Sequence, residues 1–191
     1  MHSYETPKAE ELIINLKENL DILCGDLNLV LVNKVSDHTF VRRIRNFIED
    51  NKLIENYDYI IIDCPPSLSM LTINAMTTAD WVLVPIQCEY YALEGLSQLI
   101  HTVELVKERL NPILEIEGVV FTMYDARTNL SLQVVENVKE NLQQNIYKTI
   151  IPRNIRLAEA PSYGMPINLY DPKSTGASAY QRLADEVMNR E

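Results

Sequence analysis

An aspartate that follows a run of isoleucines has the clearest chemical potential in this chain. Residues 57–63 read Tyr-Asp-Tyr-Ile-Ile-Ile-Asp, which predicts a buried strand with Asp63 emerging at its end. A carboxylate in that place can hold a water of a Mg²⁺ shell, because Mg²⁺ is bound by few carboxylates and keeps several of its waters. The alternative is a helix N-cap, in which Asp63 or Ser67 accepts hydrogen bonds from the first amides of the next helix.

A strand of this kind is typical of the Walker B element of a P-loop nucleotidase, whose phosphate loop has a pattern of its own. That pattern, G-x-x-x-x-G-K-[ST], requires two glycines five residues apart and then a lysine. The glycines of the chain are Gly25, Gly95, Gly118, Gly164 and Gly176, and no two of them have this spacing. The 191 residues therefore indicate a nucleotide-switch family without the loop that holds the nucleotide.

Predicted strands and helices alternate along the chain. Apolar runs predict strands at 19–24, 58–63, 81–86, 118–123 and 146–151. Helical spacing of apolar residues predicts helices at 39–56, 71–76, 92–110, 132–142 and from 177 onward. Residues 26–38 are ambiguous, and 152–175 are expected to form a loop because of their prolines and glycine. Alternation of this kind predicts an α/β fold, with a mostly parallel sheet and helices on both faces.

Four residues stand at or just past the ends of predicted strands, namely Asp63, Glu89, Asp125 and Pro152. Ligands of open parallel sheets bind at the carboxyl ends of the strands. We expect these residues at one edge of the sheet, although such convergence follows from the fold class and does not by itself make a site.

Composition excludes several classes of protein. A length of 191 residues fits one domain, and no apolar run approaches the roughly 20 residues of a membrane span. The first seven residues lack the basic and apolar regions of a secretory signal. The three cysteines form no C-x-x-C pair, which predicts buried thiols in a reducing cytoplasm rather than disulfides or a zinc site. A net charge of −10 argues against a general nucleic-acid coat, so DNA binding would require a few arginines on one face and would be salt-sensitive.

Four motifs together carry a resemblance to a known family. They are YDYIIIDCPPSL at 57–68, CEYYALEGL at 88–96, MYDARTNL at 123–130 and IPRNIRLAEAPSYG at 151–164. In this order and spacing they resemble the ParA/Soj family of chromosome and plasmid partition ATPases, which are deviant Walker P-loop ATPases. The resemblance is strong over 56–191 and looser before it, with 1–50 divergent, so we interpret 1–191 as a single, partial ParA-type ATPase domain.

The resemblance implies roles for individual residues. Asp63 matches the Walker B aspartate near Mg²⁺, and Pro152 lies in the segment that borders the adenine of ATP. Arg127 and Arg156 match basic positions that contact the DNA backbone in the ATP-bound dimer, a task that suits the guanidinium fork. The simpler alternatives are an ion pair of Arg127 with Asp125 or a contact at a helix start, and an ion pair of Arg156 with Glu159.

The resemblance also implies a function and partners. The family acts in ATP-dependent segregation of chromosomes or plasmids, through ATP-gated homodimerisation, non-specific DNA binding and a ParB-like centromere-binding protein, in the cytoplasm and on the nucleoid. A membrane-targeted, MinD-like relative is the weaker interpretation, because residues 185–191 lack the basic amphipathic face that membrane docking requires.

The family's usual first strand, lysine-rich phosphate loop, helix and second strand have no match in these residues. We therefore expect a P-loop NTPase-like, three-layer fold that lacks the first strand and the loop, as in a truncated or split family member. Phosphoryl transfer is catalysed almost wholly by positioning and charge, so this chain is not expected to hydrolyse ATP alone. The alternative is a non-catalytic fragment that binds DNA or a partner. Loss of an interior strand leaves strand edges that either close up, accept another chain or destabilise the fold.

Overall fold

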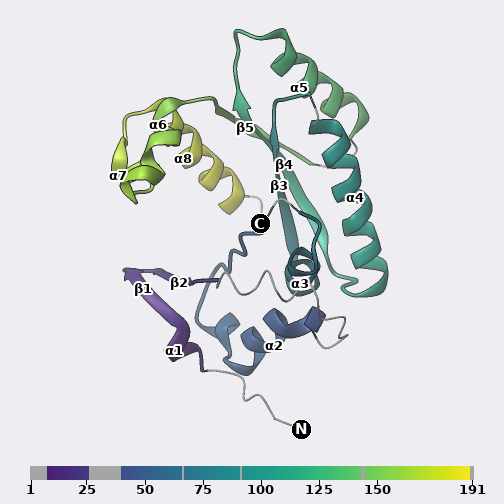
Figure 1. Ribbon diagram of the computed structural model, residues 1–191, viewed down its shortest axis with the longest axis vertical. Helices are drawn as coiled ribbons and strands as arrows, with labels where there is room; N and C mark the ends of the chain where they lie inside the picture. The colour runs from purple at the N-terminus through teal and green to yellow at the C-terminus, as the bar shows by residue number, and fades with distance from the viewer. Residues whose placement is uncertain (1–7, 26–39, 66, 91, 143–144, 190–191) are drawn as a thin grey trace. The chain divides into compact units, whose positions relative to one another are not determined.

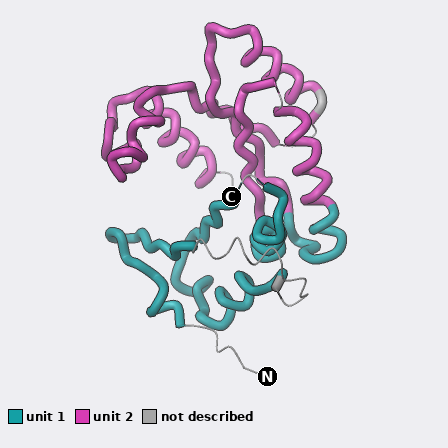
Figure 2. The backbone as a smooth tube through the Cα atoms, viewed as in Figure 1, with its two compact units in different colours: residues 1–80, 105–114 teal, residues 81–104, 115–191 magenta. Residues whose placement is uncertain are grey.

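The computed structural model describes residues 8–25, 40–65, 67–90, 92–142 and 145–189. It divides into two compact units, one of residues 1–80 with 105–114 and one of residues 81–104 with 115–191 (Figure 2). That the chain forms the single domain suggested by its length stays a prediction. The ambiguous stretch at 26–38 lies outside the described residues.

The first unit contains an antiparallel hairpin that the sequence only half predicted. Helix α1 (Ala9–Leu12) leads into β1 (Ile13–Lys17), which pairs with β2 (Leu20–Leu23). Strand β2 confirms the prediction at 19–24, whereas β1 was not predicted. The hairpin turns at Asn19, whose φ of 61° lies in the left-handed region that asparagine tolerates better than most residues.

Helical segments make up the rest of this unit. They are the 3₁₀ turn η2 (Phe40–Arg42), helix α2 (Arg43–Asp50), the turn η3 (Leu53–Glu55) and helix α3 (Met70–Thr78). The predicted helices at 39–56 and 71–76 are thus confirmed, the first being interrupted at Lys52, which has a φ of 52°. A small core of Ala9, Ile48 and Leu53 joins α1 to α2 and η3. Asn111 completes α3, since its Nδ2 donates to the carbonyls of Met76 and Ala79 at 2.9 and 2.7 Å.

The predicted strand at 58–63 is wrong. Residues 59–65 adopt no regular structure, and Ile61 is 89% exposed. A strand depends on ladder hydrogen bonds to a neighbour, and none of the described strands pairs with this segment. An apolar run can therefore have the composition of a buried strand and still lack the partner that would make it one.

The second unit is built on a parallel sheet, as the alternation of the sequence predicted. Its strands, in the order β3-β4-β5, are β3 (Trp81–Gln87), β4 (Glu115–Tyr124) and β5 (Ile146–Pro152). Helices α4 (Ala92–Arg109) and α5 (Asn129–Asn141) cover one face, and α8 (Thr175–Met188) covers the other (Figure 1). These elements confirm the predicted α/β class with helices on both faces.

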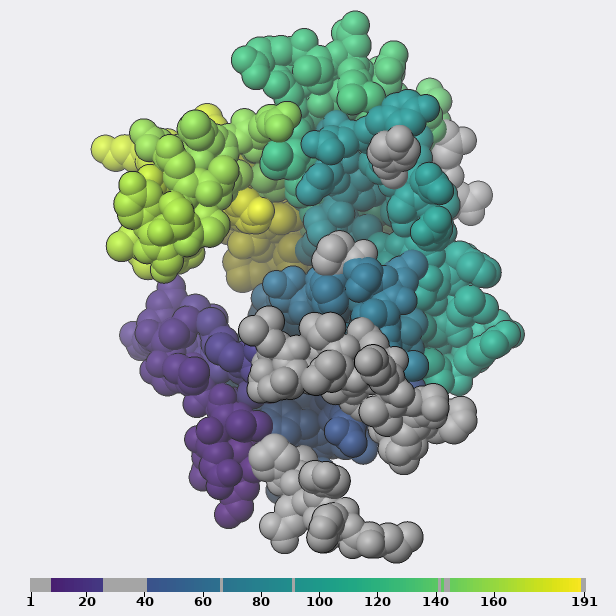
Figure 3. All heavy atoms as spheres, viewed as in Figure 1, coloured from purple at the N-terminus to yellow at the C-terminus, as the bar shows by residue number. Residues whose placement is uncertain are grey.

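Two cores hold this second unit together, one on each face of the sheet. The first is formed by strand residues such as Val84, Phe121 and Val119 with α4 and α5, whose atoms adjoin in the space-filling view (Figure 3). The second packs Val120, Tyr147 and Ile151 against Ala179 of α8. Phe121 and Ala179 are fully buried, so both faces of β4 lie in the interior.

The predicted loop at 152–175 instead contains short helices. They are α6 (Ile155–Glu159), the 3₁₀ turn η4 (Ala160–Tyr163) and α7 (Ile167–Tyr170). Asn154 caps α6 by accepting a bond from the amide of Arg156, and Gly164 closes η4 with a φ of 63°. Pro161 sits in the first turn of η4, where its missing N–H is not needed. Proline and glycine here mark the ends of short helices rather than a loop.

Strand β5 contains an irregularity that α8 stabilises. Between Val119 and Phe121 of β4 the pairing advances two residues, whereas on β5 it advances four, from Ile146 to Ile150. Within this bulge, the amides of Lys148 and Thr149 donate to the two carboxylate oxygens of Glu186 at 2.7 and 2.9 Å. Glu186 thus supplies acceptors for two amides of the bulge.

Candidate functional site

The carboxyl ends of the three parallel strands form one edge of the second unit. Tyr124 at the end of β4 is paired with Pro152 at the end of β5, and the amide of Arg153 donates to the Tyr124 carbonyl at 2.8 Å. Asp125 follows β4 directly, and Glu89 lies just beyond β3. Three of the four predicted residues therefore follow adjacent strands at this edge, as the fold class requires. The fourth, Asp63, belongs to the first unit.

Arg127 and Asp125 form a bidentate ion pair. The Arg127 Nε and Nη2 donate to Asp125 Oδ1 and Oδ2 at 2.9 and 2.7 Å, and the Arg127 amide donates to Oδ1 at 3.0 Å. These bonds, the guanidinium first, hold the pKa of the Asp125 carboxyl well below its usual range. Of the alternatives weighed for Arg127, the pair with Asp125 is therefore present.

The ion pair leaves part of the Arg127 guanidinium facing solvent. Its side chain is 87% exposed, whereas that of Asp125 is 17% exposed. Arginine has five donors, and Asp125 engages those of one edge of the fork. Thr128 starts the next helix by accepting a bond from the amide of Ser131, which fixes the backbone that carries Arg127. The arginine is thus both oriented and accessible.

Arg153 is a second arginine near the same carboxylate that sequence reasoning missed. Its charge also lowers the pKa of Asp125, although less than the bonds from Arg127 do. Arg153 is exposed and directly follows Pro152. The signal available in the sequence was its place one residue beyond a predicted strand end, at the edge where Asp125 was expected.

Arg156 is held by two carboxylates. Its Nη1 lies 2.9 Å from Glu159 Oε2, and its Nε lies 3.4 Å from Asp171 Oδ2. The Tyr170 hydroxyl also donates to Glu159 Oε2 at 3.1 Å, and Tyr170 stacks on Tyr163 with ring centroids 5.0 Å apart. The predicted alternative, a pair with Glu159, is present. Asp171 was not predicted, because no helical or strand spacing relates it to Arg156.

Asp63 is an exposed carboxylate in the first unit. The predicted alternative in which Asp63 or Ser67 caps the next helix is wrong, since the N-cap residue of α3 is Ser69. Among the residues that the structure describes, no three His, Cys, Asp or Glu gather into a metal site. A lone exposed carboxylate fits Mg²⁺ only through a water of the metal's shell, which is the role that the sequence suggested.

The cysteines differ in environment. Cys88 is buried, and burial raises the pKa of its thiol to about 11. The pKa of Cys64 is also raised, by burial first and then by the charge of Asp63. Cys24 is exposed, so the prediction of buried thiols is wrong at this position, which directly follows an exposed hairpin.

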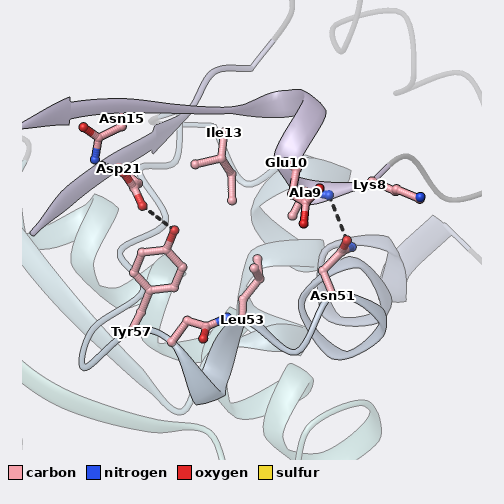
Figure 4. A pocket seen from close by; sticks show the side chains of 10 residues that line it. Lys8, Ala9, Glu10, Ile13, Asn15, Asp21, Asn51, Leu53 and Tyr57 are labelled. Carbon is pink, nitrogen blue, oxygen red and sulfur yellow. Dashed lines mark hydrogen bonds between the residues drawn. The ribbon is translucent and has the colours of Figure 1, made fainter.

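The largest cavity described, of about 420 Å³, lies in the first unit between the hairpin and the α2–η3 segment (Figure 4). Its polar groups bond to each other. The Tyr57 hydroxyl donates to Asp21 Oδ2 at 2.6 Å, Asn15 donates to Asp21 Oδ1 at 2.7 Å, and Asn51 accepts from the amide of Ala9 at 2.8 Å. The bond from Tyr57 lowers the pKa of Asp21. None of the predicted site residues lines this cavity, whose bonds fix the hairpin.

Comparison with protein families and curated proteins gives consistent matches. A family model described as an AAA domain matches residues 2–116. The sporulation initiation inhibitor protein Soj of Bacillus subtilis is 56% identical over 170 residues, which cover 89% of this chain and 67% of that protein. The chromosome partitioning protein ParA of Caulobacter vibrioides is 47% identical over 189 residues, which cover 98% of this chain and 71% of that protein.

Solved structures share the fold. Cobyrinic acid a,c-diamide synthase from Mycobacterium smegmatis, with bound ADP and magnesium, has a TM-score of 0.76 at 29% identity, over 95% of this chain and 67% of that chain. The cell division ATPase MinD of Pyrococcus furiosus has a TM-score of 0.74 over 97% of this chain and 72% of that chain. At 24% identity, the second likeness shows the fold alone. In the part of the chain that the structure describes, no helix is both long enough and apolar enough to cross a membrane.

Proposed function

The chain belongs to the ParA/Soj family of partition ATPases, and on that premise we propose that it serves DNA segregation by binding DNA non-specifically through arginines at the carboxyl edge of its sheet. The names of its relatives support the partition role. The finer part of the proposal, which residues contact DNA, rests on the chain's own geometry.

The arrangement of Arg127 is the observation that carries the proposal. Asp125 orients one edge of its guanidinium while the side chain stays 87% exposed, and Arg153 adds a second exposed positive charge near the same carboxylate. An oriented fork loses little rotamer freedom when it binds a phosphate. Contacts to phosphate position a protein on DNA without reading the sequence, which suits a segregation protein that works along any stretch of DNA.

The overall charge of the chain shapes this binding. With a net charge of −10, approach to DNA is opposed everywhere except at local basic patches. Each phosphate contact contributes a salt dependence through counterion release. We therefore expect weak binding at physiological salt, which strengthens steeply as salt is lowered.

Fluorescence anisotropy with a duplex of arbitrary sequence, between 50 and 200 mM salt, tests the proposal. Arg127→Gln should weaken binding equally for unrelated duplexes and reduce the slope of log K against log salt by about 1. A matched control is Arg45→Gln on α2, because Arg45 is also an exposed arginine paired with a nearby carboxylate, Glu49 at 3.0 Å. Equal losses for the two variants, or no binding by the unsubstituted chain, would refute the proposal.

Arg156 is the second DNA-contacting residue that we propose, although its two carboxylates compete with phosphate. Its side chain is 50% exposed, less than that of Arg127. Binding to DNA would require it to exchange Glu159 or Asp171 for a phosphate oxygen. We therefore assign Arg127 the larger share of the affinity.

Nucleotide binding would involve Asp63 and Pro152. Asp63 would accept a hydrogen bond from a water of the Mg²⁺ shell, and Pro152 would border the adenine. Bound Mg²⁺ would neutralise phosphate charge, but these 191 residues contain no phosphate-loop pattern to complete the site. We propose that this chain does not hydrolyse ATP alone. Titration with a fluorescent ATP analogue and Mg²⁺ should show no binding, whereas binding that Asp63→Ala abolishes would contradict this part.

Partners follow from the family. We propose a homodimer, a ParB-like centromere-binding protein and the nucleoid as the chain's setting, in the cytoplasm. The missing phosphate-loop pattern favours a second candidate, a non-catalytic module that binds DNA or a partner. DNA affinity that is unchanged by ATP would favour this module over an ATP-gated switch.

A further inference from the structure

Strand β3 has an uncovered edge and an uncovered face. It pairs with β4 on one side, and no other described strand pairs with it on the other side. Val84 and Ile86 point into the core beneath α4 and α5. The alternate residues point to the opposite face, where Trp81 is 59% exposed and Leu83 is 38% exposed. The expectation that this apolar strand is covered on both faces is therefore wrong.

The opposite edge of the sheet is protected, which makes the exposure at β3 notable. On the face that bears Trp81, α8 packs on β4 and β5 through Val120, Tyr147 and Ile151, and no β3 residue belongs to that core. Glu186 of α8 also engages two amides of β5. Proteins normally blunt an apolar edge strand with charges, bulges or a covering helix, and β3 carries no charged residue.

The backbone groups that β3 presents at its edge can be worked out from its pairing. The amide of Cys88 donates to the carbonyl of Thr122 on β4 at 3.0 Å. Because amides alternate in direction along a strand, those of Gln87 and Leu83 point away from β4. Pro85 shares their direction but has no N–H, as is usual for proline in an edge strand. The edge therefore offers unequal pairing groups, chiefly around Leu83 and Gln87.

A second copy of the chain would fit this surface poorly. Two β3 edges related by a twofold axis perpendicular to the sheet would pair antiparallel and place both bare faces on the same side. The backbone groups would be paired, but the exposed Trp81 and Leu83 of each copy would stay uncovered side by side. A strand followed by a helix would instead cover the edge and the face together, which is how α/β units pack.

We propose that β3 is a docking surface for a strand–helix segment of another polypeptide. The strand adds parallel to β3, and the helix that follows lies on Trp81 and Leu83 beside α8. The relatives contain sequence of the right extent, since the matches cover only 67% of the Bacillus Soj and 71% of the Caulobacter ParA. The proposal requires neither DNA nor nucleotide, so it stands or fails separately from the proposed function.

The chain contains its own reporter for this test, because Trp81 is its only tryptophan. The probe is the part of Bacillus subtilis Soj that lies outside the 170 matched residues, co-expressed with the full 191-residue chain and, for emission and quenching, with any tryptophan of its own replaced by phenylalanine. Docking should shift Trp81 emission to shorter wavelength, reduce acrylamide quenching several-fold and slow hydrogen exchange at the amides of Leu83 and Gln87. Sedimentation should show a 1:1 complex.

Two variants separate docking from general stickiness. Leu83→Lys places a charge on the proposed surface and should lower the affinity for the probe at least tenfold. Leu132→Lys is the matched control, since Leu132 is a similarly exposed leucine, 44% exposed, on α5 at the other face of the sheet. Circular dichroism of each variant verifies that it folds.

The outcomes are decisive in either direction. A 1:1 complex that Leu83→Lys weakens and Leu132→Lys does not would support the proposal. Self-association of the chain that protects Trp81 without the probe would overturn it in favour of a second copy. A folded chain whose Trp81 stays accessible at saturating probe, or equal losses for both variants, would also overturn it.

Discussion

Replacement of Glu186 by alanine should be among the most destabilising single changes on the surface of α8. The Glu186 carboxylate accepts the amides of Lys148 and Thr149 at 2.7 and 2.9 Å, where the bulge of β5 leaves them without ladder partners. Hydrogen bonds to charged groups contribute about 1.5–3 kcal/mol each, and a buried amide left without an acceptor costs about 1–3 kcal/mol.

The two amides differ in what water can replace. Thr149 is buried, so its amide should lose most of its bond, whereas Lys148 is exposed and water can take the place of the carboxylate. We therefore expect Glu186→Ala to lower the free energy of unfolding by about 2–3 kcal/mol. Glu186→Gln keeps one acceptor oxygen and places an NH₂ against the other amide, so its cost should be similar or somewhat smaller.

Urea unfolding followed by far-ultraviolet circular dichroism measures this difference. The control is Asp185→Ala, the neighbouring exposed acid on α8, which should change stability by less than about 0.5 kcal/mol. Hydrogen exchange at residues 148 and 149 should accelerate in Glu186→Ala. A Glu186→Ala variant as stable as the Asp185→Ala control would refute the argument that this carboxylate satisfies the bulge.

Three further outcomes are expected. Glu159→Gln should raise the affinity for DNA in an anisotropy assay, because it removes a carboxylate that competes for Arg156; an unchanged affinity would contradict a phosphate-binding role for that arginine. Gly176→Ala should lower the thermal midpoint, since a Cβ at this position would lie 2.6 Å from Cγ of Leu157, at a cost of about 1–3 kcal/mol; a midpoint equal to that of the parent would show that the leucine yields freely. The pKa of Asp21 is lowered by a tyrosine hydroxyl in the folded chain, so its contribution to stability is present above its ordinary pKa and is lost as pH falls through the lowered value; acid titration of Asp21→Asn should lack that part of the pH dependence.

Local periodicity was sufficient for the elements that bury a regular face. Helices α4, α5 and α8 and strands β3, β4 and β5 were predicted within a few residues, because their apolar residues recur at helical spacing or in unbroken runs. The parallel arrangement followed from the alternation of these elements. The edge at which Glu89, Asp125 and Pro152 lie could be predicted for the same reason.

Partner-dependent features could not be predicted in this way. The isoleucines of 60–62 have the composition of a buried strand, yet this segment pairs with no described strand. Strand β1 forms because it meets β2 across a turn at Asn19, and its polar residues hid it from pattern analysis. The helices within 152–175 depend on caps at Asn154 and Gly164, which read as breakers when only composition is considered.

The sequence by itself determined the family, the α/β class and the identity of the candidate residues, because motif order and apolar spacing are properties of neighbours along the chain. Only the tertiary structure decided how those residues are used. It placed Arg127 in an oriented but exposed pair with Asp125, and it brought Asp171 to Arg156 across fifteen positions. It also left β3 uncovered where its composition predicted burial. Burial and ion pairing depend on which surfaces meet in space, and spacing along one chain does not specify that.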